Sequence, residues 1–371
     1  MKKINLSILL LLIVSVLTVA QNKSVLLKQA VEEKSTIEES YPIDARPLLE
    51  KFNKANGIDL QKLEPIPQQL KKTAWNFVEG SQQSLWASDL RTGASPAFYQ
   101  APSTCRKVGS NAYIFVEDSL WNTGKVDQKA VDSVQIAFDN KTPANKNKGI
   151  YQTNIETFGY PPNIDNDPKI IILILNIRDG YKASVGGSYT AGYFYGYNQY
   201  TPAQGAPYSN EAEIYYLDGD PLNLKTSGGL TTGMSTTAHE FQHMIHFNYI
   251  ANDETFFNEG WSLVAEVING YPLYNPFRYA SEPNHYLLDW RRTDNYLLSN
   301  DYSRAARFAL YIKEQFGIGI LKKYLENRVG GINGLNTALQ ALVPTEARRF
   351  NNIIEDWFIA NYLNDKNLDT R

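Results

Sequence analysis

Short apolar runs separated by Gly, Pro and Asn mark the chain between about residues 85 and 230, and they predict β-strands. The clearest runs are residues 113–116 and 169–175, and further candidates span 189–200 and 212–217. The 169–175 run is continuous rather than alternating, which predicts a strand buried on both faces. One of the two later strands is expected to form a sheet edge with which an extended peptide can pair its backbone.

In residues 231–371 the pattern becomes helical. Residues 304–316 are amphipathic and stop at Gly317, and residues 350–363 carry an apolar stripe at helical spacing. We therefore predict an α+β fold. A twisted, mostly antiparallel or mixed sheet in residues 85–230 is followed by a helical subdomain, with a cleft between the two.

The composition is that of an ordinary globular protein, with 371 residues of which 43% are hydrophobic and 20% are charged. This length accommodates one large domain or two smaller ones. The formal net charge of −3 gives no basis for nucleic-acid binding, so no nucleic-acid partner is expected.

Residues 1–20 have the pattern of a secretory signal peptide, because a pair of lysines precedes a short apolar run that ends in the small residue Ala20. We expect a secreted or extracytoplasmic protein with no stable membrane insertion after cleavage. A retained amino-terminal anchor is the alternative. Residues 21–84 are polar and charged, and we interpret them as a leader or propeptide-like segment. The alternative is that they form an integral first layer of the domain.

The sequence His239-Glu240-Phe241-Gln242-His243 is an H-E-x-x-H motif. Two histidines four positions apart share one face of a helix, so their ring nitrogens can converge on one metal ion. Glu240 lies beside the first histidine and can accept a proton from water activated by that metal. The chain has four histidines, and three of them fall within this predicted helix. The pattern favours a zinc hydrolase over a helix with two incidental histidines.

A catalytic zinc ion takes three protein ligands and leaves one position for water. We predict Glu259 as the third ligand, because the sixteen positions after His243 leave room for a turn and the start of a second helix. Glu266 lies on nearly the same face as Glu259, and is a rival ligand, a group that orients a ligand histidine, or a solvated helix charge. We expect His246 to be buried or to face substrate rather than to bind the metal.

Two other features, a polar turn and a single cysteine, give weaker indications of a functional site. Residues 163–167 resemble the opening of a calcium loop but lack its central Gly and closing Glu, so a polar turn is the better interpretation and a calcium requirement is unsupported. Cys105 is the single cysteine, which excludes an intramolecular disulfide. We interpret Cys105 as a buried small residue, with a nucleophile or an inhibitory zinc ligand as the alternatives.

The stretch from Ala238 to Asn248, followed by Phe-Asn-Glu-Gly-Trp at residues 257–261, resembles the hyicolysin family of secreted bacterial zinc metalloendopeptidases. Softer similarities upstream and downstream extend the resemblance over roughly residues 100–365. The resemblance implies a zincin-like fold with a gluzincin-type site, one catalytic zinc ion, and protein or peptide substrates.

The Asn-Glu-Gly triplet at residues 258–260 is also similar to the zinc aminopeptidase family, in which this glutamate is the third ligand. The similarity to that family also implies that Tyr302 stabilises the oxyanion. This chain has Arg304 and Ala305 where the family has Lys and Gly. Packing of a helix is the alternative role of Tyr302. The family's Gly-Ala-Met-Glu-Asn motif, whose glutamate holds a free amino terminus, is absent from the sequence, which favours an endopeptidase.

The sequence therefore predicts a secreted zinc metalloendopeptidase with Glu240 as general base. The alternatives are a zinc aminopeptidase and a non-enzymatic surface or adhesion protein with a structural zinc site. Glu240 argues against the structural site, which needs no proton acceptor and usually has four protein ligands.

Overall fold

The computed structural model describes residues 41–63, 74–273, 278–290, 295–345 and 347–363. The predicted signal peptide and the first part of the predicted leader lie outside these ranges. The described residues form two compact units: a small one of Tyr41 with residues 181–189, and a large one from residues 42–180 and 190–371. In the small unit, the rings of Tyr181 and Tyr189 meet edge-on with centroids 5.7 Å apart. The helices of the described residues belong to the large unit.

A seven-stranded mixed sheet has the strand order β1-β6-β7-β5-β4-β3-β2. Its strands are β1 (Tyr41–Asp44), β2 (Gln82–Ser88), β3 (Phe98–Val108), β4 (Ala112–Glu117), β5 (Ile170–Leu175), β6 (Ser188–Phe194) and β7 (Ile214–Asp218). β5 pairs in parallel with β4 and β7, whereas β2–β3, β3–β4 and β6–β7 are antiparallel. The predicted strands at residues 113–116, 169–175 and 212–217 are confirmed, and so is the predicted α+β fold with a mixed sheet.

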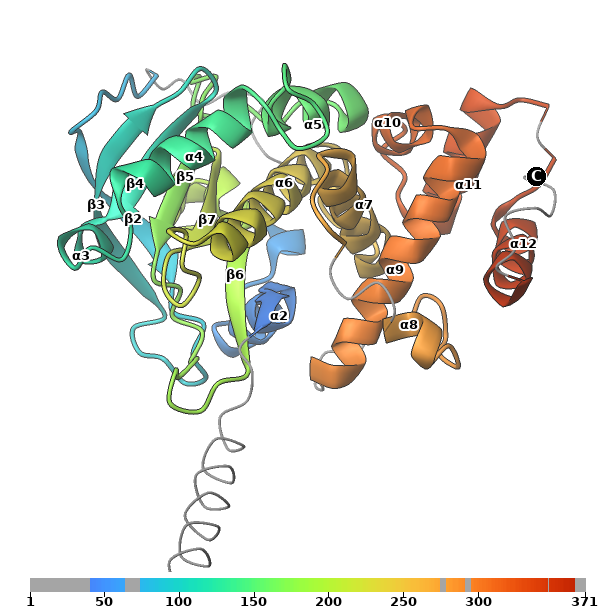
Figure 1. Cartoon of the computed structure of the whole chain (residues 1–371), viewed down its shortest axis with the longest axis horizontal. Helices are drawn as coiled ribbons and strands as arrows, with labels where there is room; N and C mark the ends of the chain where they lie inside the picture. The colour runs from blue at the N-terminus through green and yellow to red at the C-terminus, as the bar shows by residue number, and fades with distance from the viewer. Residues whose placement is uncertain (1–40, 64–73, 274–277, 291–294, 346, 364–371) are drawn as a thin grey trace, which may run out of the picture. The chain divides into compact units, whose positions relative to one another are not determined.

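β5 lies at the centre of the sheet, and all six of its residues are buried. Ile171, Leu173 and Leu175 belong to a core cluster on one face of the sheet. The intervening isoleucines point to the other face, because side chains alternate along a strand. That second face is covered by α4 (Gln128–Asp139) and α6 (Ser227–Tyr249) (Figure 1). The short helix α3 (Asp118–Asn122) directly follows β4, and α5 (Ile150–Phe158) packs against α4 and α6. The continuous apolar run is thus explained by two dry faces.

The second half of the chain is helical, as the sequence predicts. Its helices are α7 (Thr255–Ile268), α8 (Arg278–Ser281), α9 (Asn295–Phe316), α10 (Gly319–Glu326), α11 (Gly331–Leu342) and α12 (Phe350–Leu363). α7 packs against α6 and α9, and aromatic rings such as those of Trp261, Phe308 and Trp357 fill the space among the helices. α9 ends before Gly317, whose φ of +81° favours glycine. Within the described part of the chain, no helix combines the length and apolar composition needed to cross a membrane.

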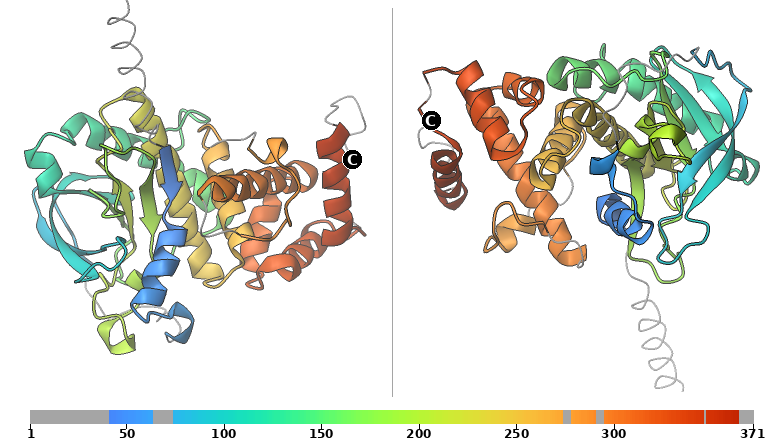
Figure 2. Two further views of the ribbon diagram at one scale, coloured as in Figure 1. Left: turned by 90° about the horizontal axis from the view of Figure 1, so that it is seen from below. Right: turned by 180° about the vertical axis from the view of Figure 1, so that it is seen from behind.

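Residues 41–55 fold into β1 and helix α2 (Arg46–Ala55), which the sequence pattern does not predict. Leu49 and Phe52 of α2 are buried in the core cluster, where the Phe52 ring meets the Phe98 ring edge-on with centroids 5.1 Å apart. Figure 2 shows α2 beside β6 and α6.

The prediction of a sheet edge at residues 189–200 or 212–217 is wrong. β7 is an inner strand, and β1 pairs with the outer side of β6, so β1 rather than β6 ends the sheet. β6 is also shorter than expected, because the chain leaves the sheet after Phe194 and forms the 3₁₀ turn η2 (Gly196–Gln199).

Candidate active site

Helix α6 presents two histidines side by side. Its amino terminus is capped by Thr226, whose Oγ1 accepts a hydrogen bond from Gly229 N at 3.1 Å. His239 and His243 are buried and lie one turn apart, with ring centroids separated by 4.6 Å. Their Nε2 atoms are 3.0 Å apart, so both rings direct the same nitrogen to one point.

Helix α7 brings a carboxylate to the same point. Oε2 of Glu259 lies 3.3 Å from His239 Nε2 and 3.5 Å from His243 Nε2, and its side chain is fully buried. Among the described residues, His239, His243 and Glu259 form the cluster of His, Cys, Asp or Glu side chains that is close enough to hold a metal ion.

The donor set fits a tetrahedral metal ion. Ligand bonds of about 2.0–2.2 Å in a tetrahedral zinc site separate the ligand atoms by roughly 3.3–3.6 Å. The three separations found here, 3.0, 3.3 and 3.5 Å, are close to this range. Oε2 of Glu259 is buried and accepts no hydrogen bond from the described residues. A buried acceptor without a donor is costly, and a cation would satisfy it.

Each histidine is oriented through its other nitrogen. His239 Nδ1 lies 2.8 Å from Oε1 of Glu266, and the second oxygen of Glu266 accepts a hydrogen bond of 2.6 Å from Ser235. His243 Nδ1 lies 2.7 Å from Oδ1 of Asn258. Because these oxygens accept hydrogen bonds, each Nδ1 carries the proton and each Nε2 keeps a lone pair for a metal.

The charges of this group also suit a cation. Burial opposes ionisation of Glu259, but Arg46 and the two imidazoles hold the pKa of its carboxyl well below the ordinary value. Burial lowers the pKa of His243. Burial also acts to lower the pKa of His239, but its interactions with the carboxylates of Glu259 and Glu266 raise that pKa well above the ordinary value. The site therefore concentrates negative charge around two ring nitrogens.

Glu240 lies between α6 and the sheet. Its side chain is buried, and its Oε2 accepts a hydrogen bond from Phe194 N of β6 at 2.7 Å. β6 approaches closely because Gly192 has no side chain: a Cβ atom there would lie 3.4 Å from Glu240 Cγ and only 2.5 Å from Thr236 Cγ2. The absence of a side chain at Gly192 thus lets Glu240 pack directly against the strand.

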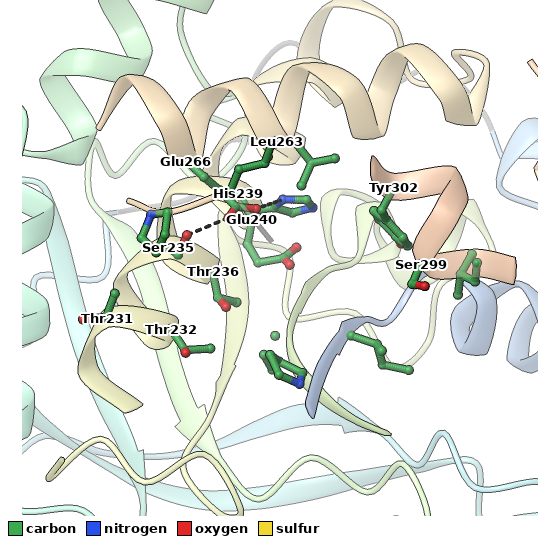
Figure 3. Close-up of a pocket in the computed structure, with 17 residues that line it drawn as sticks. Thr231, Thr232, Ser235, Thr236, His239, Glu240, Leu263, Glu266, Ser299 and Tyr302 are labelled. Carbon is green, nitrogen blue, oxygen red and sulfur yellow. Dashed lines mark hydrogen bonds and ion pairs between the residues drawn. The ribbon is translucent and has the colours of Figure 1, made fainter. Parts of the chain in front are cut away.

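A largely apolar pocket of about 300 Å³ opens beside Glu240 and His239. Tyr302 of α9 lines it, packed edge-on against Trp290 with ring centroids 4.9 Å apart. Figure 3 shows Tyr302 across the pocket from Thr231 and Thr232 of α6, with Glu240 between them. The pocket gives an apolar side chain a place next to the candidate metal site.

The remaining candidates lie apart from the ligand group. His246 is fully buried, and its Nε2 lies 2.8 Å from Oδ2 of Asp253. In the polar turn at residues 163–167, Asp165 accepts hydrogen bonds from the Trp75 indole and the Asp167 amide. Cys105 is buried in the core cluster, and burial raises the pKa of its thiol to about 11, which suits an inert small residue.

Sequence reasoning missed three residues that contact the group, and one of them is Ser262, whose Oγ lies 2.9 Å from His243 Nδ1. Asn258 binds His243, and its position beside Glu259 in the Asn-Glu-Gly triplet is a signal that could have indicated this. Arg46 donates from Nε to Oε1 of Glu259, and no local pattern indicates a contact across 213 positions.

The mixed sheet, the H-E-x-x-H helix and the carboxylate from the following helix together define a metallopeptidase. The family model of peptidase M30 matches residues 99–252, a stretch that contains His239, Glu240 and His243. The neutral metalloprotease ShpI of Staphylococcus hyicus is 26% identical over 344 residues, which cover 86% of this chain and 72% of that protein. The match to the peptidase M30 model confirms the resemblance to the hyicolysin family, and the chain is a metallopeptidase that hydrolyses peptide bonds in protein or peptide substrates.

Proposed function

We propose that the chain is a secreted zinc endopeptidase in which His239, His243 and Glu259 hold the metal and Glu240 is the general base. The proposal is carried by the convergence of three buried ligand atoms. One of them, Oε2 of Glu259, accepts no hydrogen bond from the described residues. Two imidazoles and one carboxylate are a common ligand set of catalytic zinc, and they leave a fourth position open. The signal-peptide pattern of residues 1–20 supports secretion.

Zinc held by these ligands would polarise the scissile carbonyl and lower the pKa of water from 15.7 to about 7. Glu240 accepts the proton of the attacking water and then delivers it to the leaving amine. The hydrogen bond from Phe194 N holds the Glu240 carboxylate toward β6 and fixes its orientation. Glu266 and Asn258 keep the ligand rings in the tautomer that binds metal.

Tyr302 is our candidate for the group that stabilises the oxyanion, because it lines the same pocket as Glu240 and His239. The same pocket binds an apolar side chain next to the cleaved bond. Its lining comes from β1 and β6 on one side and from α6, α7 and α9 on the other, so the substrate lies between the sheet and the helical half.

Endopeptidase action is favoured over aminopeptidase action, because the sequence lacks the Gly-Ala-Met-Glu-Asn motif that holds a free amino terminus. The other alternative, a surface protein with a structural zinc site, disagrees with the family match. It also leaves no role for Glu240 beside an incomplete ligand set.

An internally quenched peptide with a blocked amino terminus tests the proposal. The zinc-loaded chain should cleave it, and a chelator should abolish cleavage until zinc is restored. Glu240→Gln should retain stoichiometric zinc and lose about 10²–10⁴-fold in kcat, since general acid–base catalysis contributes that much. Glu314→Gln, on the exposed side of α9, is the matched control and should leave kcat unchanged. Cleavage only of peptides with a free amino terminus would show an aminopeptidase instead.

A further inference from the structure

Arg46 reaches the candidate metal site from the amino-terminal part of the chain. It is the first residue of α2, and its Nε donates a hydrogen bond to Oε1 of Glu259. The Glu259 side chain is fully buried, whereas 25% of the Arg46 side chain remains exposed. A cation of this chain thus lies against the carboxylate that we assign to the metal, and it enters from the solvent side.

β1 takes the position that an extended substrate needs. β6 is the strand that contacts Glu240, through Phe194 N and the close approach of Gly192. An extended peptide gains backbone hydrogen bonds by adding to the open edge of such a strand. Here that edge of β6 is paired with β1. A substrate can pair with β6 beside Glu240 only if β1 leaves.

The same segment closes the space on both sides of Glu240. Pro42 and Ile43 of β1 form part of the wall of the apolar pocket. Arg46, Leu49 and other residues of α2 cover a second pocket of about 130 Å³, whose other walls include Glu240 and His243. The access to the candidate catalytic group is therefore bounded by residues 42–53 in both pockets.

α2 is attached through apolar contacts with the core cluster and through a hydrogen bond beside β6. Phe52 contacts the rings of Phe98 and Tyr195, and Asn53 accepts a hydrogen bond from the Tyr195 hydroxyl. Tyr195 directly follows β6, so α2 is fastened beside the strand that borders the site.

Resting on the proposed function, we propose that residues 42–55 are an inhibitory leader that occupies the substrate cleft. β1 takes the place of the substrate backbone along β6, and Arg46 pairs with the carboxylate of the third metal ligand. The chain is therefore latent until this segment is displaced. If the segment were instead an integral layer, Arg46 would support Glu259 in the active enzyme, and its loss would have the opposite effect.

Arg46→Gln in the full chain tests the proposal. The change removes the guanidinium beside Glu259, and we expect cleavage of the internally quenched peptide to rise about tenfold or more, because the competent fraction rises. Zinc affinity, measured by competition with a chromophoric chelator, should also increase. Lys51→Gln is the matched control, since it removes the same charge from an exposed position of the same helix and should change neither value.

A binding measurement separates occupancy of the substrate cleft by residues 42–55 from effects on peptide cleavage. In the Glu240→Gln background, a fluorescently labelled peptide with aliphatic side chains should bind about tenfold or more tightly when Arg46→Gln is added, by anisotropy. Phe52→Ala, which loosens α2 away from the ligands, should raise binding and cleavage in the same direction. This second variant keeps the test sharp if Arg46→Gln folds poorly.

Two results would overturn the leader proposal, and a third would overturn only the proposed function. Equal cleavage and equal peptide binding by the parent, Arg46→Gln and Phe52→Ala chains contradict it while leaving the proposed function intact. Loss of both zinc and cleavage in Arg46→Gln contradicts it by showing that Arg46 supports Glu259. Tighter peptide binding by Arg46→Gln without cleavage by any zinc-loaded form supports occupancy of the cleft and contradicts the endopeptidase function.

Discussion

Oε1 of Glu266 lies 2.8 Å from Nδ1 of His239, and both side chains are buried. The nitrogen that faces Glu266 is not the one that faces Glu259, which lies 3.3 Å from His239 Nε2. One imidazole thus connects two carboxylates of the same helix, seven residues apart on α7. This arrangement assigns them different roles: Glu259 is placed for the metal, and Glu266 is placed to orient the ring.

Glu266→Gln should weaken zinc binding without removing it. The hydrogen bond to the Glu266 carboxylate orients His239 and raises the basicity of its ring, and an amide weakens this bond. Loss of such a partner costs about 10–100-fold in metal affinity or activity. Zinc competition with a chromophoric chelator measures the change. Ser235→Ala removes the hydrogen bond to the other Glu266 oxygen and should have a smaller effect in the same direction. Complete loss of zinc in Glu266→Gln, with retention in Glu259→Gln, would reverse the two roles.

Tyr302→Phe should lower kcat by about 10²–10³-fold with little change in KM, because an oxyanion donor acts mainly in the transition state. The ring contact with Trp290 survives this change, so the fold should hold. Tyr311→Phe on the same helix is the control, since Tyr311 does not line the pocket. A normal kcat in Tyr302→Phe would leave Tyr302 a packing role only.

Gly192→Ala should cost stability and turnover together. The added Cβ would lie 2.5 Å from Thr236 Cγ2 and 2.8 Å from the backbone oxygen of Tyr216, so β6 or α6 must move. Overpacking of this kind costs about 1–3 kcal/mol in the free energy of unfolding. Gly228→Ala in α6 is the control, because a Cβ there meets nothing within 4 Å. Denaturant melts of both variants measure the change in stability, and cleavage of the quenched peptide measures turnover. An unchanged midpoint of unfolding in Gly192→Ala would contradict the close packing.

Stability should fall as pH rises from about 4.5 toward 9. Burial, and then the charge of Asp165, raise the pKa of Glu213 to about 9, so the folded chain holds a proton that the unfolded chain releases. The stabilisation is complete below the ordinary pKa of 4.5 and is lost as pH approaches the folded value, at up to about 1.4 kcal/mol per pH unit for one proton.

Glu213→Gln cannot ionise and should flatten this dependence in denaturant melts across pH 5–9, as expected for a single proton. Glu314→Gln, at an exposed position, should keep the parental slope. Equal slopes in the parent and Glu213→Gln chains would show that Glu213 is ionised in the folded state.

The sequence predicts those parts of the molecule that depend on local spacing. The i, i+4 spacing of His239 and His243 suffices to bring their rings together once α6 forms. The apolar run at residues 169–175 predicts β5, because burial on both faces leaves no polar position. Both features follow from residues that are neighbours in the chain.

The parts that escape prediction depend on docking between distant segments. Arg46 and Glu259 meet across 213 positions, and no local pattern around Arg46 indicates which surface its segment folds against. The contact of Asn258 with His243 requires the particular packing of α7 on α6. β1 changes which strand ends the sheet, although it is only four residues long.

The donor atoms come from two helices, with both rings on α6 and the carboxylate on α7. An ion bound there links these two helices, so metal loading should raise the melting temperature as well as enable turnover. A fragment that ended at residue 252 would keep every letter of the H-E-x-x-H signature and lack one of the three donors. The presence of the H-E-x-x-H signature in a fragment therefore does not mean that the fragment has a complete set of metal ligands.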